Sequence, residues 1–170
     1  MKIYLGCDLF IEGQRLQAKK VQNALEERFK DKIDLYNPAD NLEINDKAAG
    51  FASTYQILLA DYERLKKSDL LIGLMDTKDL GLAAEMGIAF ERNIPIFQLY
   101  TDIRLTGNDR DDKLLEMKKD IFQNDFLYIN KLVTGLSYAD RDGNIFEKPR
   151  IYKSSDDLIH ALIEYIEMNL

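Results

Sequence analysis

The fold is decided by residues 69–75, which read DLLIGLM and are almost entirely apolar. A short apolar run of this kind predicts a central strand that is covered on both faces. The polar turn 76–79 follows it, residues 81–91 then have the pattern of a helix rich in glycine and alanine, and residues 95–100 form another apolar run. Alternation of strand, helix and strand argues for a parallel sheet between layers of helices.

The segments on either side continue this alternation. We predict a strand at 2–7, a helix at about 14–29, a strand at 33–36 and a helix at 54–67. Beyond the central unit, we predict helices at 112–122 and from the polar cap 154–157 to about 168. Residues 39–50 are polar and acidic and longer than a usual connection, which is typical of functional loops. Because we find no internal repeat and no interdomain linker, we expect residues 1–170 to form a single α/β domain.

Composition narrows the chemistry that the chain can perform. Its 170 residues include 23 Lys and Arg against 30 Asp and Glu, a net charge of −7, so the surface repels polyanions and nucleic acid is not an expected partner. Cys7 and His160 are the only cysteine and the only histidine, which excludes an internal disulfide and a Cys/His metal site. Histidine-dependent catalysis would need His160, which lies near the C-terminus in a helical pattern. We therefore expect any chemistry to fall to carboxylates.

The sequence contains no apolar run near the roughly 20 residues that span a bilayer. Residues 1–6 enter a strand pattern at once, without an apolar leader and a cleavage site. We therefore expect a soluble cytoplasmic protein with no membrane partner. Cys7 is expected to be a small buried hydrophobe and His160 a surface residue.

Candidate functional residues follow the predicted strands, because ligands of open α/β sheets bind beyond the carboxyl ends of the strands. The polar or aromatic residues in those positions are Asp8, Phe10, Asp40, Asn41, Asp76 and Asp79. Glu85 joins them, since it lies four residues past Gly81 near the start of the next helix. We expect the helix dipole to keep its carboxylate ionised, as a carboxylate nucleophile must be. The small residues around Glu85 allow a ligand to approach closely, or else they serve close helix–sheet packing while Glu85 faces solvent.

Four places in the chain resemble the nucleoside 2-deoxyribosyltransferase family. The strand IYLG at 3–6, followed by Phe10, is similar to that family's opening strand and aromatic residue. Asp61, eight residues before Asp69, matches the family aspartate on the helix before the third strand. Residues 79–89 follow the signature D-x-G-x-x-x-E-x-G-x-A, and residues 130–135 resemble the segment N-x-M-x-x-G.

The resemblance implies a flavodoxin-like (Rossmann-like) parallel sheet of about five strands flanked by helices. It also implies a nucleoside-salvage enzyme, without cofactor or metal, that moves 2-deoxyribose between purine or pyrimidine bases. In such a retaining transfer, a carboxylate attacks C1′ and holds the sugar covalently while a proton donor neutralises the departing base. Glu85 would be the nucleophile, Asp61 or Asp79 would exchange the proton, and Tyr4 would orient Glu85.

The resemblance also implies a set of substrate-binding residues and a set of partners. Asp79 and Asn130 would hold the 5′-hydroxyl, Phe10 would stack on the base, and Gly6 would border the sugar. Leu132 stands where the family usually has Met. The expected partners are 2′-deoxynucleosides, free nucleobases and further copies of the chain, in a dimer or a hexamer built from dimers. Asn130 would then reach the site of a neighbouring subunit.

Each of these residues also has a purely structural interpretation. Asp61 could be a solvated helix carboxylate, Asp79 a helix cap, and Tyr4 part of the core. Phe10 and Asn130 could equally be structural.

Two other functions fit the same residues. One is an N-glycosidase acting on nucleosides or nucleoside 5′-monophosphates, in which water replaces the second base. The other is a non-catalytic nucleotide-sensing module, in which Glu85 would only accept a hydrogen bond from a sugar hydroxyl.

Overall fold

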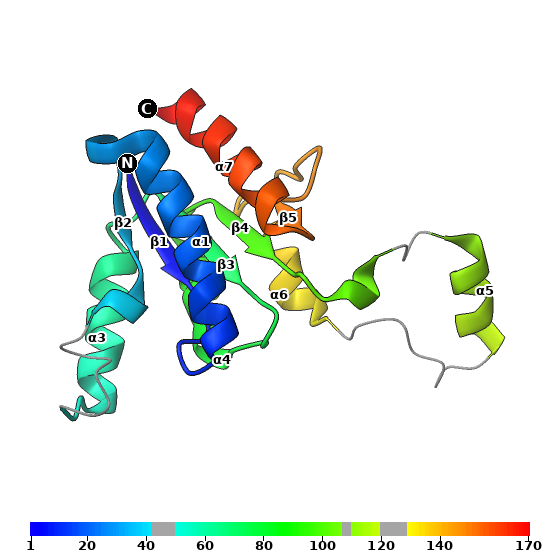
Figure 1. Cartoon of the computed structure of the whole chain (residues 1–170), viewed down its shortest axis with the longest axis horizontal. Helices are drawn as coiled ribbons and strands as arrows, with labels where there is room; N and C mark the ends of the chain where they lie inside the picture. Colours follow the sequence, from blue (N-terminus) through cyan, green and yellow to red (C-terminus); the bar gives the residue numbers. More distant parts are fainter. Residues whose placement is uncertain (42–49, 107–109, 120–128) are drawn as a thin grey trace.

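The computed structural model describes residues 1–41, 50–106, 110–119 and 129–170. Its centre is a parallel sheet in the order β2-β1-β3-β4-β5, drawn in Figure 1. The strands are β1 (Lys2–Gly6), β2 (Asp34–Tyr36), β3 (Leu70–Leu74), β4 (Ile96–Leu99) and β5 (Ile151–Tyr152). The strand order reverses direction between β1 and β3, which is the flavodoxin-like arrangement and places the switch point at the ends of these two strands. The expected fold class is confirmed.

Helices cover both faces of the sheet. The longer of these are α1 (Glu12–Phe29), α3 (Thr54–Leu65), α4 (Leu80–Glu91) and α7 (Ser155–Asn169), and α6 (Lys131–Gly135) is a short one. Helix α5 (Asp111–Lys119) is drawn apart from the sheet in Figure 1. Single 3-10 turns lie at η1 (Lys30–Lys32), η2 (Pro38–Asp40) and η3 (Ile103–Leu105). No helix in the described part of the chain is long and apolar enough to cross a membrane.

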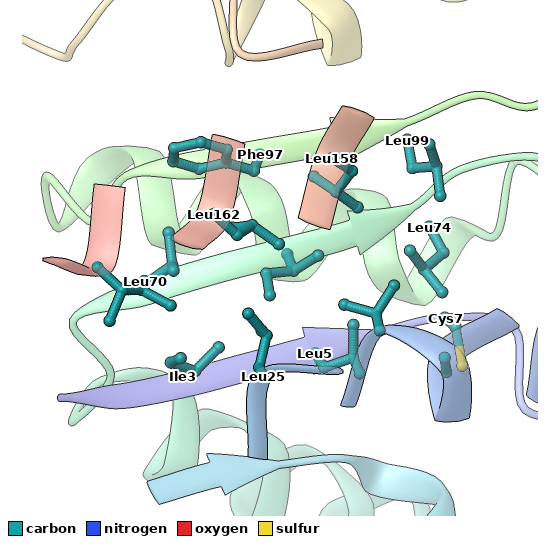
Figure 2. Packing of buried hydrophobic residues seen from close by; sticks show 14 of the residues in the cluster. Ile3, Leu5, Cys7, Leu25, Leu70, Leu74, Phe97, Leu99, Leu158 and Leu162 are labelled. Carbon is teal, nitrogen blue, oxygen red and sulfur yellow. The ribbon is translucent and has the colours of Figure 1, made fainter. Parts of the chain in front are cut away.

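The alternation of side chains along β1 sorts its residues between two cores. Ile3 and Leu5 pack with α1 and α7 in the cluster shown in Figure 2. Tyr4 points to the opposite face and packs with side chains of α3 and α4. Gly6 lies two residues further along β1 and therefore on the same face as Tyr4. Because successive residues of a strand point to opposite faces, Tyr4 and Gly6 both face helix α4.

Most predicted elements are present, with ends shifted by one to a few residues. Ser154 caps α7 as predicted, because its side chain accepts a hydrogen bond from the Asp157 N–H. The predicted helix 112–122 is observed as α5, and its last three predicted residues lie outside the described residues, as does 42–49 of the predicted functional loop. The strand β5 and the helix α6 were not among the segments identified from the sequence. Cys7 is buried and His160 is an exposed residue of α7, as expected.

Candidate active site

Glu85 and Tyr4 form a hydrogen-bonded pair between α4 and β1. The Tyr4 hydroxyl donates to Glu85 Oε1 at 2.8 Å, and the Tyr4 side chain is fully buried. Burial raises the pKa of Tyr4 far above its ordinary value, and the charges of Glu85 and Asp61 raise it further, so this phenol remains a proton donor. Glu85 is half-buried rather than solvent-facing. The orienting contact expected of Tyr4 is therefore present, and its catalytic use stays a prediction.

Gly6 makes room for the Glu85 carboxylate. A Cβ atom at this position would lie 2.4 Å from Leu82 Cδ1 and 3.2 Å from Glu85 Oε2. The first distance is a clash and the second is tighter than an ordinary contact, so a side chain at position 6 would displace the Leu82 or Glu85 side chain. Gly6 thus fixes how near Glu85 lies to the switch point of the sheet.

Asp79 caps helix α4. Its Oδ1 accepts a hydrogen bond from the Leu82 N–H at 2.7 Å, which satisfies one of the free amides of the first turn. The structural interpretation of Asp79 is therefore correct as far as the cap is concerned. The same side chain also lines the cavity beside Glu85. The two roles are compatible, because a carboxylate has a second oxygen.

A cavity of about 190 Å³ lies at the carboxyl end of β1, between α3 and α4. Glu85, Asp79 and Asp61 contribute three carboxyl groups to its wall, and Gly6 and Phe10 also line it. None of the described lining residues is basic. Pockets that enclose a whole ligand usually measure roughly 300–1,000 Å³, so the described walls hold only part of such a ligand.

Burial sets the protonation of Glu85. It raises the pKa of this carboxyl to about 8. The hydrogen bond from Tyr4 lowers the pKa, while the neighbouring charges of Asp61 and Asp79 raise it. The expectation that the helix dipole keeps Glu85 ionised is wrong. Glu85 is the sixth residue of α4, and the dipole acts mainly within the first turn, so burial dominates.

Asn130 and Leu132 do not belong to this cavity. Asn130 caps α6, and its Oδ1 accepts from the N–H groups of Leu132 and Val133 at 2.9 and 3.3 Å. Neither residue is among those that line the cavity, and the Leu132 side chain is 79% exposed. The buried Gln98 holds this segment to β4, since its Nε2 donates to the Val133 carbonyl and to Ser137 Oγ.

The carboxylates of three other candidates from the strand ends accept hydrogen bonds from other residues of the chain. Asp8 accepts from the Phe10 N–H, Asp40 accepts from Gln22, and Asp76 accepts from Thr101. None of the three lines the cavity. Each of these carboxylates therefore has a structural partner in the described part of the chain.

Several residues of the cavity wall were not predicted from the sequence, among them Cys7 and Ile57. Ile57 is four residues before Asp61 on α3, and this helical spacing could have placed the two on one face. Cys7 directly follows Gly6, and burial raises the pKa of its thiol to about 12, so it stays neutral. Among the described residues, no group of His, Cys, Asp and Glu could hold a metal ion.

Comparison with known proteins decides the family. A family model described as nucleoside 2-deoxyribosyltransferase matches residues 3–141. The chain belongs to this family. A search of curated proteins gave no match.

Three solved structures resemble this nucleoside 2-deoxyribosyltransferase family member. A conserved protein from Enterococcus faecalis V583 is 32% identical, with a TM-score of 0.80 and coverage of 97% of this chain and 98% of the other. The 2-deoxyribosyltransferase from Bacillus psychrosaccharolyticus is 17% identical, with a TM-score of 0.62 and coverage of 94% and 90%. A CMP N-glycosidase from Clostridium botulinum is 16% identical, with a TM-score of 0.51 and coverage of 97% and 99%. The last two similarities concern the fold alone.

Proposed function

We propose that this protein transfers 2-deoxyribose from one nucleobase to another, with Glu85 as the nucleophile. The observation that carries the proposal is a half-buried carboxyl group that a buried tyrosine orients inside a cavity with two further carboxyl groups. Membership of the nucleoside 2-deoxyribosyltransferase family supports the reaction type.

In the first half-reaction, a Glu85 oxygen forms a bond to C1′ of the bound deoxynucleoside. The C1′–nitrogen bond breaks at the same centre, and the departing base takes the electron pair. Attack by the second base at C1′ then releases Glu85 and restores the original configuration at the sugar. Tyr4 holds the non-attacking oxygen throughout and keeps the carboxyl group in one orientation.

The proton balance of this step can be met inside the cavity. Glu85 must lose the proton that burial favours, and the departing base must gain one. Asp61 and Asp79 line the same cavity, so either can accept the proton from Glu85 and deliver it to the base. The second half-reaction runs the same transfer in reverse, and no proton has to be exchanged with solvent.

Charge favours a nucleoside over a nucleoside 5′-monophosphate. A phosphate would enter a cavity whose described walls carry three carboxyl groups and no basic side chain. Repulsion between these anions disfavours a nucleotide, whereas a neutral hydroxyl can donate a hydrogen bond to a carboxylate such as Asp79. The N-glycosidase alternative is therefore kept for nucleosides only, with water as the acceptor.

The test is to incubate the protein with deoxyinosine and free adenine or cytosine and to separate the products by chromatography. We expect a new deoxynucleoside from wild type and none from Glu85→Ala. Glu91→Ala is the matched control, because Glu91 ends the same helix with an exposed side chain and is expected to keep full activity. Release of hypoxanthine without a new nucleoside would instead assign a hydrolase, and undiminished transfer by Glu85→Ala would remove Glu85 from the mechanism.

We also propose that a second copy of the chain completes the site. Helix α3 exposes an apolar stripe formed by Tyr55, Leu58, Leu59 and Tyr62, at the spacing that places all four on one helix face. Asn130 and the exposed Leu132 lie outside the cavity of their own chain, which encloses only part of a ligand. We propose that burying this stripe against a second copy forms the interface across which Asn130 and Leu132 of the partner complete the cavity.

Complementation tests the shared site. Glu85→Ala and Asn130→Ala proteins are each expected to be inactive, and mixing them should restore activity, because a mixed oligomer contains some sites with both residues intact. Subunit exchange has to be verified with differently tagged chains. Verified exchange without recovery would refute the shared site, and an active monomer would refute it as well.

A further inference from the structure

Helix α3, which carries Asp61, buries few side chains against the rest of the protein. Within α3, all of which the structure describes, only Leu65 is fully buried, and Leu65 is the last residue of the helix. Helix α3 also packs on α4, and the contacts of its last turn hold the end of the helix that follows Asp61.

One of these contacts joins Arg64 to Tyr36. The guanidinium carbon of Arg64 lies 5.0 Å from the ring centroid of Tyr36, within the range of a cation–π interaction. Tyr36 ends strand β2, and its ring centroid is 5.4 Å from that of Tyr4 on the neighbouring strand. Its hydroxyl accepts a hydrogen bond from Asn41 Nδ2 at 3.2 Å. Tyr36 is thereby held on two sides, next to the residue that orients Glu85.

Arg64 and Asp61 are three residues apart on α3, so they occupy neighbouring positions on one side of the helix. Through Arg64, Tyr36 ties the turn that carries Asp61 to the sheet beside Tyr4. Burial raises the pKa values of Tyr4 and Glu85, and the charge of Asp61 raises both further. The electrostatic effect of Asp61 on the pair therefore reports how closely α3 is held.

We propose that Tyr36 and Arg64 are positioning residues that hold α3, and with it the Asp61 carboxylate, against the Tyr4–Glu85 pair. Neither side chain lines the cavity, so neither is a catalytic residue. This inference rests on the proposed function, since the placement of Asp61 matters for a reaction only if Glu85 and Asp61 take part in it.

The test is a titration of Glu85 by carbon NMR, in protein labelled at the glutamate carboxyl carbons and assigned with Glu85→Gln. Asp61→Asn should lower the pKa of Glu85, because it removes a repelling charge. Arg64→Met should lower it in the same direction, because α3 is released and Asp61 moves away. Loss of the Arg64 charge by itself would act in the opposite sense, so a lowered pKa cannot be a direct charge effect.

Two controls and a double variant complete the design. Arg64→Lys keeps a cation over the ring, and Lys67→Met removes a nearby exposed charge; both should leave the pKa of Glu85 as in wild type. Arg64→Met added to Asp61→Asn should have no further effect, because Arg64 acts through Asp61. In a transfer assay, Arg64→Met should lower kcat about two- to five-fold, the factor that an exposed cation–π contact is worth.

An unchanged or raised pKa in Arg64→Met would overturn the inference, and so would an equal lowering in the Asp61→Asn background. Arg64 is exposed, so its replacement does not endanger folding. The titration needs no substrate, and a wild-type protein without transfer activity would refute the proposed function while the titration still tests the positioning pair.

Discussion

Replacing Glu85 with glutamine should stabilise the folded protein, and the gain should grow with pH. Burial and two neighbouring carboxylates raise the pKa of Glu85 from its ordinary value of 4.5 to about 8. A carboxyl group with a raised pKa in the folded state binds its proton more tightly there than in the unfolded chain. Its contribution to stability is therefore complete below about pH 4.5 and is lost as the pH rises toward 8. Glutamine keeps the shape and an acceptor for Tyr4 but never ionises.

The size of the effect follows from the displacement of the pKa. Each pKa unit corresponds to about 1.4 kcal/mol, so ionised Glu85 destabilises the folded state by up to about 5 kcal/mol at pH 9. Small domains are stable by roughly 5–15 kcal/mol, so an effect of this size is readily measured. At pH 5, Glu85 is neutral in the folded protein, and wild type and Glu85→Gln should have similar free energies of unfolding.

The assay is urea unfolding followed by circular dichroism, at pH 5 and pH 9, for wild type and Glu85→Gln. Glu91→Gln provides the control, because its side chain is exposed at the end of the same helix and its substitution should have no pH-dependent effect. A difference between wild type and Glu85→Gln that is the same at both pH values would refute the argument that burial keeps Glu85 protonated.

Three further predictions concern the reaction. For wild type, kcat/KM should fall as the pH rises through about 8, because the proton that Glu85 supplies for the departing base is then lost to solvent. Tyr4→Phe should move this fall to higher pH, because it removes the hydrogen bond that lowers the pKa of Glu85; identical pH profiles would contradict this. Gly6→Ala should place a Cβ 2.4 Å from Leu82 Cδ1 and 3.2 Å from Glu85 Oε2. This crowding should destabilise the fold by about 1–3 kcal/mol and lower kcat. Gly87→Ala is the control: its Cβ meets no atom within 4 Å, so it should change neither the free energy of unfolding nor kcat in the same measurements. Inosine should bind but react at least about 100-fold more slowly than deoxyinosine, because its 2′-hydroxyl would hold Glu85 in a ground-state hydrogen bond, and equal kcat values would exclude a preference for 2-deoxyribose.

Local sequence patterns were sufficient to predict the elements whose apolar run or helical spacing is long or uninterrupted. The apolar run before Asp76 became β3, the small-residue helix became α4, and Ser154 caps α7. The alternation of side chains along a strand also places Tyr4 and Gly6 on one face of β1. The family signature assigned Glu85 to the helix that this face contacts. These features depend on periodicity within one segment, which a single sequence displays directly.

The remaining features depend on tertiary contacts. Strand β5 has two residues and α6 has five, too few for a period to be visible. The protonation of Glu85 depends on burial and on Asp61, which is distant in sequence. Asp76 and Asp79 both follow β3, and only the folded chain distinguishes the one that bonds Thr101 from the one that lines the cavity.

The most direct test of the account is to detect the covalent intermediate. Wild-type protein is mixed with deoxyinosine in the absence of an acceptor base, quenched rapidly in acid, and analysed by intact mass spectrometry and peptide mapping. We predict a mass increase of one deoxyribosyl group on the peptide that contains Glu85, and none in Glu85→Gln. A deoxyribosyl group on another residue, or turnover of deoxyinosine without any covalent adduct, would contradict the assignment of Glu85 as the nucleophile.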